Sequence, residues 1–366
     1  MKTALIYHGD AHKYGFGKGH PFNGERFKNF FDFFSGRFAA YKNEFDIINP
    51  APAADGLLEL VHSRDYIKVI TAASQGKVFP DIFRYVSPDN VNPLTGYIPP
   101  GIEEGARIVV GAAVLAGELV AERKYKKAIA IGGGMHHAKP DYGEGFCFYN
   151  DVAICVRNLK QKYSLQRILV LDTDAHAGNG TMEIFYEDPQ VLFIDIHQDP
   201  RTIYPGTGFL HEIGKGKGEG FTVNLALLPR TGNKAYEYLF EEVIFPLAQE
   251  YKPEAIIRYG GSDPHYMDEL TALGLTLDGF RMIGRKVFEL SEELTGGRSI
   301  DLLLSGYNQG VLPYAWAALL AGLLDLDIDL SGLKEESKLA QDSRLSETKD
   351  MVKELKKHLK KYWKCL

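Results

Sequence analysis

The stretch Arg167-Ile-Leu-Val-Leu-Asp-Thr-Asp-Ala-His-Ala-Gly-Asn-Gly180 decides the fold class of this chain. Its four apolar residues, 168–171, predict a short buried strand. Asp172, Asp174 and His176 follow at alternating positions, which point to the same side of an extended segment. Buried carboxylates are costly unless a cation or hydrogen bonds compensate them. The pattern predicts either a divalent-metal site at the carboxyl end of a strand or acidic residues that cap the next element.

Four other short apolar runs also end in polar, chemically useful residues, and helical patterns lie between many of them. These are 128–131 before the run Gly132 to His137, 191–194 before Asp195 to His197, 255–258 before Tyr259 to Asp263, and 302–304 before Ser305 to Gln309. Strands that alternate with helices predict an α/β fold, a three-layer α/β/α domain around a mostly parallel sheet. Ligands of such sheets bind outside the carboxyl ends of the strands. We therefore expect all five ends to contribute to one site.

No linker divides the sheet, so we expect one catalytic domain over residues 1–330 and a C-terminal extension over residues 331–366. Apolar residues recur at helical spacing in the tail, with lysines between them: Met351, Val352, Leu355, Leu359, Tyr362, Trp363 and Leu366. A basic amphipathic helix can bind a membrane or a partner. Here we expect its apolar stripe to pack on the chain's own domain.

Composition excludes several functional classes. The 366 residues are 45% hydrophobic and 25% charged, with a formal net charge of −6 and a pI near 6.0. This balance argues against nucleic-acid and membrane partners. The longest small-apolar stretch, 108–116, is too short to span a bilayer. Three cysteines without CxxC spacing and no signal-peptide pattern predict a cytoplasmic protein. The oligomeric state stays open, a homo-oligomer included.

Asp174, His176 and Asp263 together offer two carboxylates and one imidazole. Three protein ligands and an open fourth position are the arrangement of a catalytic zinc site. Zinc in such a site lowers the pKa of a bound water towards neutrality and so provides a nucleophile. Asp263 has a second interpretation as a turn residue in Ser-Asp-Pro.

Two further motifs supply proton chemistry. His136 and His137 follow three glycines and could exchange protons with a substrate or bind metal. Each imidazole needs an acceptor that fixes its tautomer, and Asp172 and Asn179 are the natural candidates. Tyr307, in Ser-Gly-Tyr-Asn-Gln, could donate a hydrogen bond to a carbonyl oxygen and stabilise the oxyanion that develops there.

In these motifs the chain resembles the histone deacetylase family of zinc-dependent amidohydrolases, within the arginase-deacetylase superfamily. Histone deacetylase-like amidohydrolases, acetylpolyamine amidohydrolases and acetoin utilisation proteins are relatives in that family. The resemblance covers roughly residues 5 to 325. The motifs stand in the family order: Gly19-His20-Pro21, His136-His137-Ala138, Gly145-Phe146-Cys147, Asp172-Thr173-Asp174-Ala175-His176, Gly178-Asn179-Gly180-Thr181, Tyr204-Pro205-Gly206-Thr207-Gly208 and Gly306-Tyr307.

The resemblance implies the arginase-deacetylase fold and a role for each motif residue. It implies one zinc on Asp174, His176 and Asp263, with His136 and His137 as the proton-handling pair. Tyr307 would polarise the scissile carbonyl. A narrow channel for an acyl-lysine-like chain would be lined by Phe146 and Tyr204, with Gly145 and Leu270. A structural potassium would lie near Asp172, Asp174, His176, Asp195 and Ile196. Asp89 would be the rim carboxylate that holds the substrate backbone.

Several positions depart from the family's pattern. Ala177 stands where a histidine commonly follows the histidine ligand, and Met135 stands where many relatives have glycine or an aromatic residue. Asn179 is neutral where some relatives have aspartate, which leaves His137 less cationic and a readier base. Four acids near the expected rim could steer a cationic substrate or simply be solvated: Glu103, Glu104, Asp141 and Glu144.

We therefore expect a zinc-dependent amide hydrolase that removes an acetyl or short acyl group from acyl-lysine or a similar N-acetylated amine. The substrate would be a small molecule or a peptide. An acetylpolyamine amidohydrolase is the alternative within the family. A binuclear manganese ureohydrolase would need a further carboxylate two positions after the histidine ligand, where this chain has Gly178. A catalytically silent acyl-lysine reader would not need the complete set of ligands, histidines and tyrosine.

Overall fold

The computed structural model describes residues 2–336 and 344–366, and it contains one eight-stranded sheet. The strand order is β2-β1-β3-β8-β7-β4-β5-β6, and every neighbouring pair is parallel. The strands are β1 (Thr3–Ile6), β2 (Phe45–Ile48), β3 (Lys127–Ile131), β4 (Ile168–Asp172), β5 (Val191–Gln198), β6 (Thr222–Leu227), β7 (Ala255–Gly260) and β8 (Ser299–Leu303). The prediction of an α/β fold around a mostly parallel sheet is confirmed.

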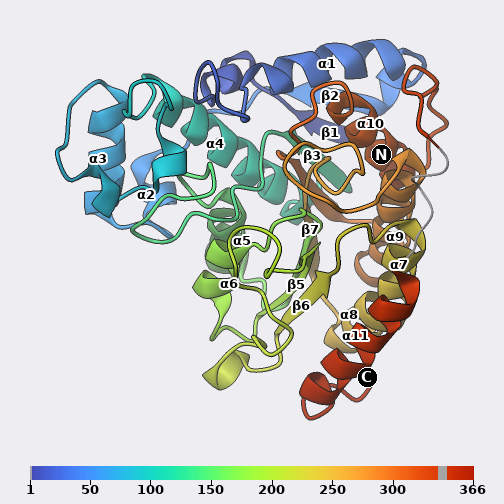
Figure 1. Cartoon of the computed structure of the whole chain (residues 1–366). Helices are drawn as coiled ribbons and strands as arrows, with labels where there is room; N and C mark the ends of the chain where they lie inside the picture. Colours follow the sequence, from blue (N-terminus) through green and yellow to red (C-terminus); the bar gives the residue numbers. More distant parts are fainter. Residues whose placement is uncertain (1, 337–343) are drawn as a thin grey trace.

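Helices cover both faces of this sheet (Figure 1). Helices α4 to α6 lie on one side, and α7 to α11 lie on the other. The helices are α1 (Glu25–Arg37), α2 (Asp55–Leu58), α3 (Arg64–Ser74), α4 (Ile102–Ala121), α5 (Asp151–Tyr163), α6 (Asn179–Phe185), α7 (Asn233–Leu239), α8 (Phe245–Tyr251), α9 (Leu277–Thr295), α10 (Leu312–Leu324) and α11 (Leu345–Leu359). A π-helical turn, Phe240–Ile244, joins α7 to α8.

Strand β4 shows why the strand sequences are continuously apolar. Ile168 and Val170 join the hydrophobic core that α4 and α5 cover, whereas Leu169 and Leu171 join the core on the opposite face. Because both faces are covered, a central strand of this sheet must be apolar at successive positions. A short run without alternation is therefore what a buried parallel strand requires.

The five predicted runs belong to five neighbouring strands, β3, β8, β7, β4 and β5. Their carboxyl ends meet at one edge of the sheet, as expected. One boundary was predicted wrongly, because β5 extends to Gln198 and so includes Asp195, Ile196 and His197. Pairing of these residues with β6 continues the strand beyond its apolar start.

The C-terminal helix α11 packs against α7 and β6. Its buried residues include Val352, Leu355 and Leu359. Just beyond the helix, Trp363 is 5% exposed and donates from Nε1 to the carbonyl oxygen of Gly220 at 2.7 Å. The apolar stripe of the tail thus contacts the body of the chain. Of the expected extension, residues 337–343 lie outside the described residues.

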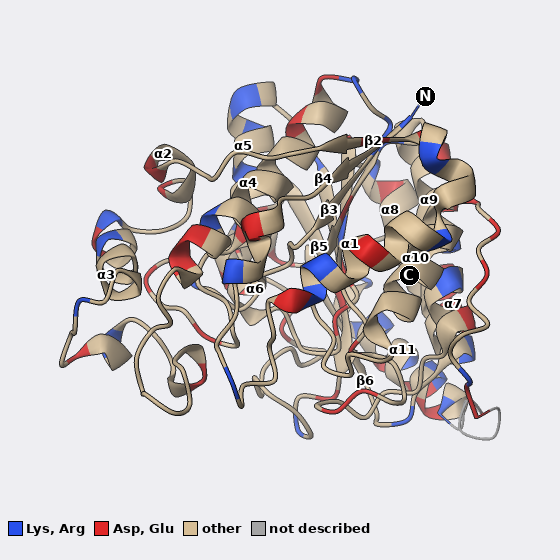
Figure 2. Ribbon diagram, turned by 90° about the horizontal axis from the view of Figure 1, so that it is seen from above, with Lys and Arg blue, Asp and Glu red and all other residues tan. Residues whose placement is uncertain are grey.

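Charged residues are dispersed over the outer surface. In the view of Figure 2, acidic and basic residues alternate along the outer helices, and neither sign forms a continuous face there. Within residues 2–336 and 344–366, no helix is both long enough and apolar enough to cross a bilayer.

Candidate metal centre and catalytic site

Three buried side chains of metal-ligating types meet at the carboxyl ends of two neighbouring strands. Asp174 and His176 follow β4, and Asp263 follows β7. His176 Nδ1 lies 3.1 Å from Asp174 Oδ1 and 3.1 Å from Asp263 Oδ2. Donor atoms about 2.0–2.1 Å from a tetrahedral zinc ion lie roughly 3.3 Å from one another. The three donors therefore have a spacing that suits one tetrahedral metal ion.

Hydrogen bonds from the chain hold these ligands in place. Asp172 Oδ1 accepts from the backbone N–H of Asp174 at 2.9 Å, and Asp174 Oδ1 accepts from that of His176 at 2.9 Å. Ser305, just after β8, donates from Oγ to Asp263 Oδ1 at 2.7 Å. The second oxygen of Asp263 is thereby turned towards His176.

The site contains more buried carboxylates than positively charged side chains to balance them. Asp172, Asp174, Asp195 and Asp263 are all buried, at most 3% exposed. Burial, with Asp174 close by, raises the pKa of Asp263 well above its ordinary value. Burial disfavours a charged His176, but its hydrogen bonds to Asp174 and Asp263 outweigh that effect and raise its pKa to about 10. A divalent cation would balance the negative charge that shared protons otherwise neutralise. The residues therefore suit a divalent metal ion.

A glycine turn brings the histidine pair to this centre. Gly132, Gly133 and Gly134 continue from β3 with φ angles of +93°, +158° and +117°, which favour glycine. Asp151, the first residue of α5, accepts from the N–H of Gly134 at 2.9 Å and from that of Met135 at 2.7 Å. The carboxylate fixes the turn immediately before the two histidines.

Each histidine has a different partner behind it. His136 Nδ1 lies 2.7 Å from Asp172 Oδ2, and His137 Nδ1 lies 2.7 Å from Asn179 Oδ1. Burial opposes a charge on His136, but Asp172 and Asp174 outweigh it and raise the pKa to about 9. Burial and the charge of His136 lower the pKa of His137 well below its ordinary value. The surroundings therefore favour the cationic form of His136 and the neutral form of His137.

Tyr307 lies near the candidate ligand His176. Its ring centroid is 6.2 Å from that of His176 and 5.9 Å from that of Phe146. Burial, with Asp174 and Asp263 nearby, raises the pKa of the phenol well above its ordinary value. The hydroxyl is thus protonated at neutral pH and can donate a hydrogen bond.

Phe146 occupies a tight turn beside the histidines. Gly145 and Phe146 have φ angles of +58° and +65°, and this conformation is unfavourable for a phenylalanine. Asn90 Oδ1 accepts from the N–H of Phe146 at 2.8 Å, and Asp89 Oδ2 accepts from that of Gly145 at 3.1 Å. A Cβ at Gly145 would lie 2.3 Å from the His137 ring. Asp89, predicted at the rim, here holds this turn.

Tyr204 and Leu270 are the more exposed members of the predicted channel. The ring centroid of Tyr204 lies 5.1 Å from that of His137, and the residue is 40% exposed. Leu270 is 41% exposed, and its N–H donates to Asp268 Oδ1 at 2.9 Å. Asp268 Oδ2 also accepts from the N–H of Tyr307 at 2.8 Å, so one carboxylate positions both segments.

The predicted potassium-site residues lie at and just after the end of β4 and within β5. Asp195 stands opposite Asp172 in the sheet register, and Ile196 follows it in the buried part of β5. Asp195 Oδ2 accepts from the N–H of Gly178 at 2.8 Å, and its Oδ1 lies 2.8 Å from His197 Nδ1. Burial and Asp195 raise the pKa of Asp172 to about 7.

Several residues that hold the site were not predicted from the sequence. Asn150 Nδ2 donates to the carbonyl oxygens of His136 at 3.3 Å and Ala138 at 3.1 Å. The buried guanidinium of Arg26 lies over the Tyr307 ring, 5.5 Å from its centroid. Asn150 is the N-cap of α5, which a capping pattern could have indicated. Arg26, like Asp151 and Asp268, gives no such local signal of its role.

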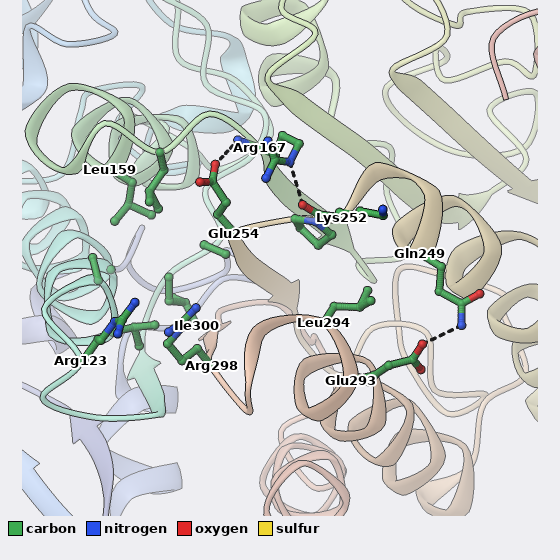
Figure 3. A pocket seen from close by; sticks show the side chains of 16 residues that line it. Arg123, Leu159, Arg167, Gln249, Lys252, Glu254, Glu293, Leu294, Arg298 and Ile300 are labelled. Atoms are coloured by element: carbon green, nitrogen blue, oxygen red, sulfur yellow. Dashed lines mark hydrogen bonds between the residues drawn. The ribbon is translucent and has the colours of Figure 1, made fainter.

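A cavity of about 700 Å³ lies at the opposite end of the sheet (Figure 3). Its wall includes Ala255 and Ile300, near the amino ends of β7 and β8, and basic Arg123 and Arg298. None of the candidate ligands, histidines or channel residues lines it. This hollow is separate from the candidate catalytic site.

Comparisons with known proteins agree with this geometry. A model of the histone deacetylase domain family matches residues 20–323. A probable deacetylase of Archaeoglobus fulgidus is 35% identical over 100% of this chain and 99% of its own length. The acetoin utilization protein AcuC of Staphylococcus xylosus is 35% identical over 88% of this chain and 82% of its own length.

A solved structure shows the same fold. The HDA15 HD domain superposes with a TM-score of 0.84 over 100% of this chain and 98% of that chain, at 23% sequence identity. Since the family model covers most of the sheet and the whole candidate site, the chain belongs to the histone deacetylase domain family and is a deacetylase of that family.

Proposed function

We propose that this chain removes an acetyl or short acyl group from the side-chain amine of acyl-lysine or from a similar amine, with one zinc ion on Asp174, His176 and Asp263. The observation that carries the proposal is the meeting of three buried ligands, a neutral imidazole and a protonated phenol at one sheet edge. Zinc there would supply a Lewis acid that lowers the pKa of a water in the open fourth position.

The chain's own residues would handle the protons. His137, neutral and held through Nδ1 by Asn179, accepts the proton of the attacking water at Nε2. The cationic His136 beside it favours the negative charge that develops on the substrate. Tyr307 donates its phenolic proton in a hydrogen bond to the substrate carbonyl oxygen. His137 then returns its proton to the leaving amine.

The surroundings of Gly178 favour one catalytic metal over two. A Cβ at this position would lie 2.5 Å from Asp172 Oδ2 and 2.9 Å from the Tyr259 hydroxyl. A carboxylate side chain therefore has no room here unless the support of His136 is displaced. The binuclear alternative requires its extra ligand at this position.

Three of the four acids expected near the rim, all but Asp141, are paired with the chain's own cations, and Glu103 among them is buried. Glu103 lies 2.6 Å from Arg107, Glu104 lies 2.8 Å from Lys13, and Glu144 lies 3.5 Å from Lys139. These acids are paired with the chain's own cations, which weakens their attraction for a polycationic substrate. Aromatic Phe146 and Tyr204 suit the uncharged methylene chain of an acyl-lysine.

A potassium ion near Asp172 and Asp195 completes the proposal. The two buried carboxylates face each other across β4 and β5, and Asp195 helps to raise the pKa of Asp172. A potassium ion held by these carboxylates, by Asp174 and by the backbone of His176 and Ile196 would lower the free-energy cost of burying two neighbouring negative charges.

The test is a comparison of kcat/KM for zinc-loaded protein on an acetyl-lysine peptide and on N-acetylated polyamines, with Tyr307→Phe as the control for the chemistry. A higher kcat/KM on the peptide supports the proposal. Preference for the polyamines selects the alternative within the family, and binding of the peptide without hydrolysis of any acylated amine selects a silent reader.

A further inference from the structure

Behind Asn179 the structure contains a third layer of contacts, centred on Glu144. The carboxylate of Glu144 accepts a hydrogen bond from Asn179 Nδ2, with Oε1 at 2.7 Å. Its side chain is 16% exposed and lies 3.5 Å from the Nζ atom of Lys139. Lys139 in turn lies 3.2 Å from Glu183. A continuous chain of polar contacts thus leads from His137 through Asn179 and Glu144 to the surface.

The turn that carries Phe146 also fixes Glu144. The N–H of Cys147 donates to the carbonyl oxygen of Glu144 at 2.9 Å, which closes the turn over Gly145 and Phe146. Asn179 lies at the start of α6 and is 6% exposed. Both partners are therefore held by the backbone, and their hydrogen bond is largely shielded from water.

This contact determines which end of the Asn179 amide faces His137. A carboxylate accepts hydrogen bonds, whereas an amide group can donate from one end and accept at the other. Because Glu144 accepts, the NH₂ group of Asn179 must face Glu144 and its oxygen must face His137. The oxygen then requires a proton on His137 Nδ1, which leaves the lone pair on Nε2.

Nε2 is the atom that the proposed mechanism uses as the base. It lies 3.0 Å from His136 Nε2, and a proton acceptor is needed there for the chemistry proposed above. If the amide of Asn179 rotated by half a turn, its NH₂ group would face His137 and favour the tautomer with the proton on Nε2. That tautomer cannot accept a proton at Nε2.

We propose that Glu144 is a positioning residue, which holds Asn179 in the one orientation that keeps His137 in its base-competent tautomer. The inference rests on the proposed function, because it concerns the same proton transfer. Asn179 has two possible orientations, and Glu144 stabilises the one with its oxygen towards His137; a protonated His136, whose Nε2 lies 3.0 Å from His137 Nε2, favours the same tautomer.

The experiment removes the acceptor and follows both catalysis and the tautomer. In zinc-loaded Glu144→Leu and Glu144→Ala, kcat on an acetyl-lysine peptide falls roughly 10- to 100-fold, the usual effect of losing such a supporting contact, while KM changes little. Glu144→Gln keeps an acceptor oxygen and retains most of the kcat. The ¹⁵N chemical shifts and N–H couplings of the His137 imidazole report loss of the Nδ1–H tautomer in the Leu and Ala variants alone.

A matched control separates this effect from general loss of charge. Glu183→Gln removes the other carboxylate from Lys139 without touching Asn179, so kcat and the His137 tautomer stay at wild-type values. A double-mutant cycle adds a second criterion. In an Asn179→Asp background either carboxylate oxygen at position 179 can accept the hydrogen bond from His137. Removal of Glu144 then causes no further loss of kcat and removes the repulsion between the two carboxylates at positions 144 and 179.

The outcomes are distinct. Wild-type kcat and an unchanged tautomer in Glu144→Leu and Glu144→Ala overturn the inference, and so does an equal loss of kcat in the wild-type and Asn179→Asp backgrounds. If wild-type protein hydrolyses no acylated amine, the proposed function fails, and the tautomer of His137 in the same variants still decides the role of Glu144. Glu144→Leu and Glu144→Ala both lack the acceptor but differ in side-chain volume. If one of them misfolds, the other still tests the inference, with Glu144→Gln as the variant that keeps an acceptor.

Discussion

His136 and His137 are adjacent in the chain, yet their partners give them opposite properties. Asp172 is a carboxylate and stabilises a cation on His136, whereas Asn179 is a neutral amide and leaves His137 uncharged. The sequence predicted both partners, because they flank the ligands in one motif. The charge difference itself depends on burial and on the distances between groups, which the sequence alone does not provide.

Tyr307→Phe should lower kcat by about 10²-fold or more, because the substrate oxyanion loses a preorganised donor. KM should change less, since the hydrogen bond strengthens as charge develops on the oxygen. Steady-state kinetics on an acetyl-lysine peptide measure both values. Tyr125→Phe, which removes a phenol bonded to Asp46, is a matched control and should leave kcat unchanged. Near-full activity of Tyr307→Phe would rule out the role assigned to this tyrosine.

The residues missed from the sequence are mostly those whose contacts are distant along the chain. Asp268 binds the N–H of Tyr307, and Arg26 donates to the carbonyl oxygen of Leu304 at 3.1 Å. Neither residue lies in a motif or at a telling spacing. The carboxylate of Asp89 is bonded to Ser87 and to the N–H of Gly145, and its predicted contact with the substrate backbone stays a prediction.

At the scale of elements, the turn at Gly145 has the strictest geometric requirement. Gly145→Ala should reduce kcat at least tenfold, because its Cβ would lie 2.3 Å from the His137 ring and displace the base. The positive φ of +58° should also cost roughly 1–3 kcal/mol of unfolding free energy. Kinetics and urea unfolding measure the two effects.

Gly36→Ala is the matched control for this substitution. Gly36 is an exposed residue of α1 with no atom within 4 Å of the added Cβ. Alanine there should leave kcat unchanged and raise the free energy of unfolding by about 0.5–1 kcal/mol, owing to its helix propensity. Wild-type kcat in Gly145→Ala would show that the turn tolerates a side chain and that His137 is not fixed by it.

Helix α11 should contribute to stability through the residue that follows it. Trp363 packs against Phe221 and Tyr251, with ring centroids 5.3 and 6.2 Å away. Trp363→Ala should therefore lower the unfolding free energy by about 3 kcal/mol. Chemical denaturation checks this value, and the exposed Lys360→Ala serves as control. An unfolding free energy unchanged in Trp363→Ala would mean that the tail does not stabilise the domain.

The central strands were predictable from sequence, because strands buried on both faces read as continuous apolar runs. The limits of β5 were not, since Asp195 and His197 are polar although they lie within the strand and are fully buried. Their burial is compensated by the hydrogen bond between them, at 2.8 Å. Hydrophobic periodicity does not reveal such a hydrogen bond, so it cannot show that these polar residues lie inside a buried strand.

For the whole molecule, the parallel sheet and its covering helices followed from the alternation of apolar runs and helical patterns. The order of the strands did not, although it is what brings Asp263 beside His176. These residues are far apart in the chain, and only the placement of β7 next to β4 makes them neighbours. The sequence therefore identified the parts of the site, and the topology joins them.

The central claim is that one metal ion on Asp174, His176 and Asp263 supports hydrolysis of an acylated amine. The most direct test is titration of metal-free protein with zinc while the hydrolysis of an acetyl-lysine peptide is measured. Activity should be absent without metal, rise with added zinc and reach its plateau at about one ion per chain, as expected for a three-ligand site. A plateau at two ions per chain, or full activity in the metal-free protein, would contradict the claim.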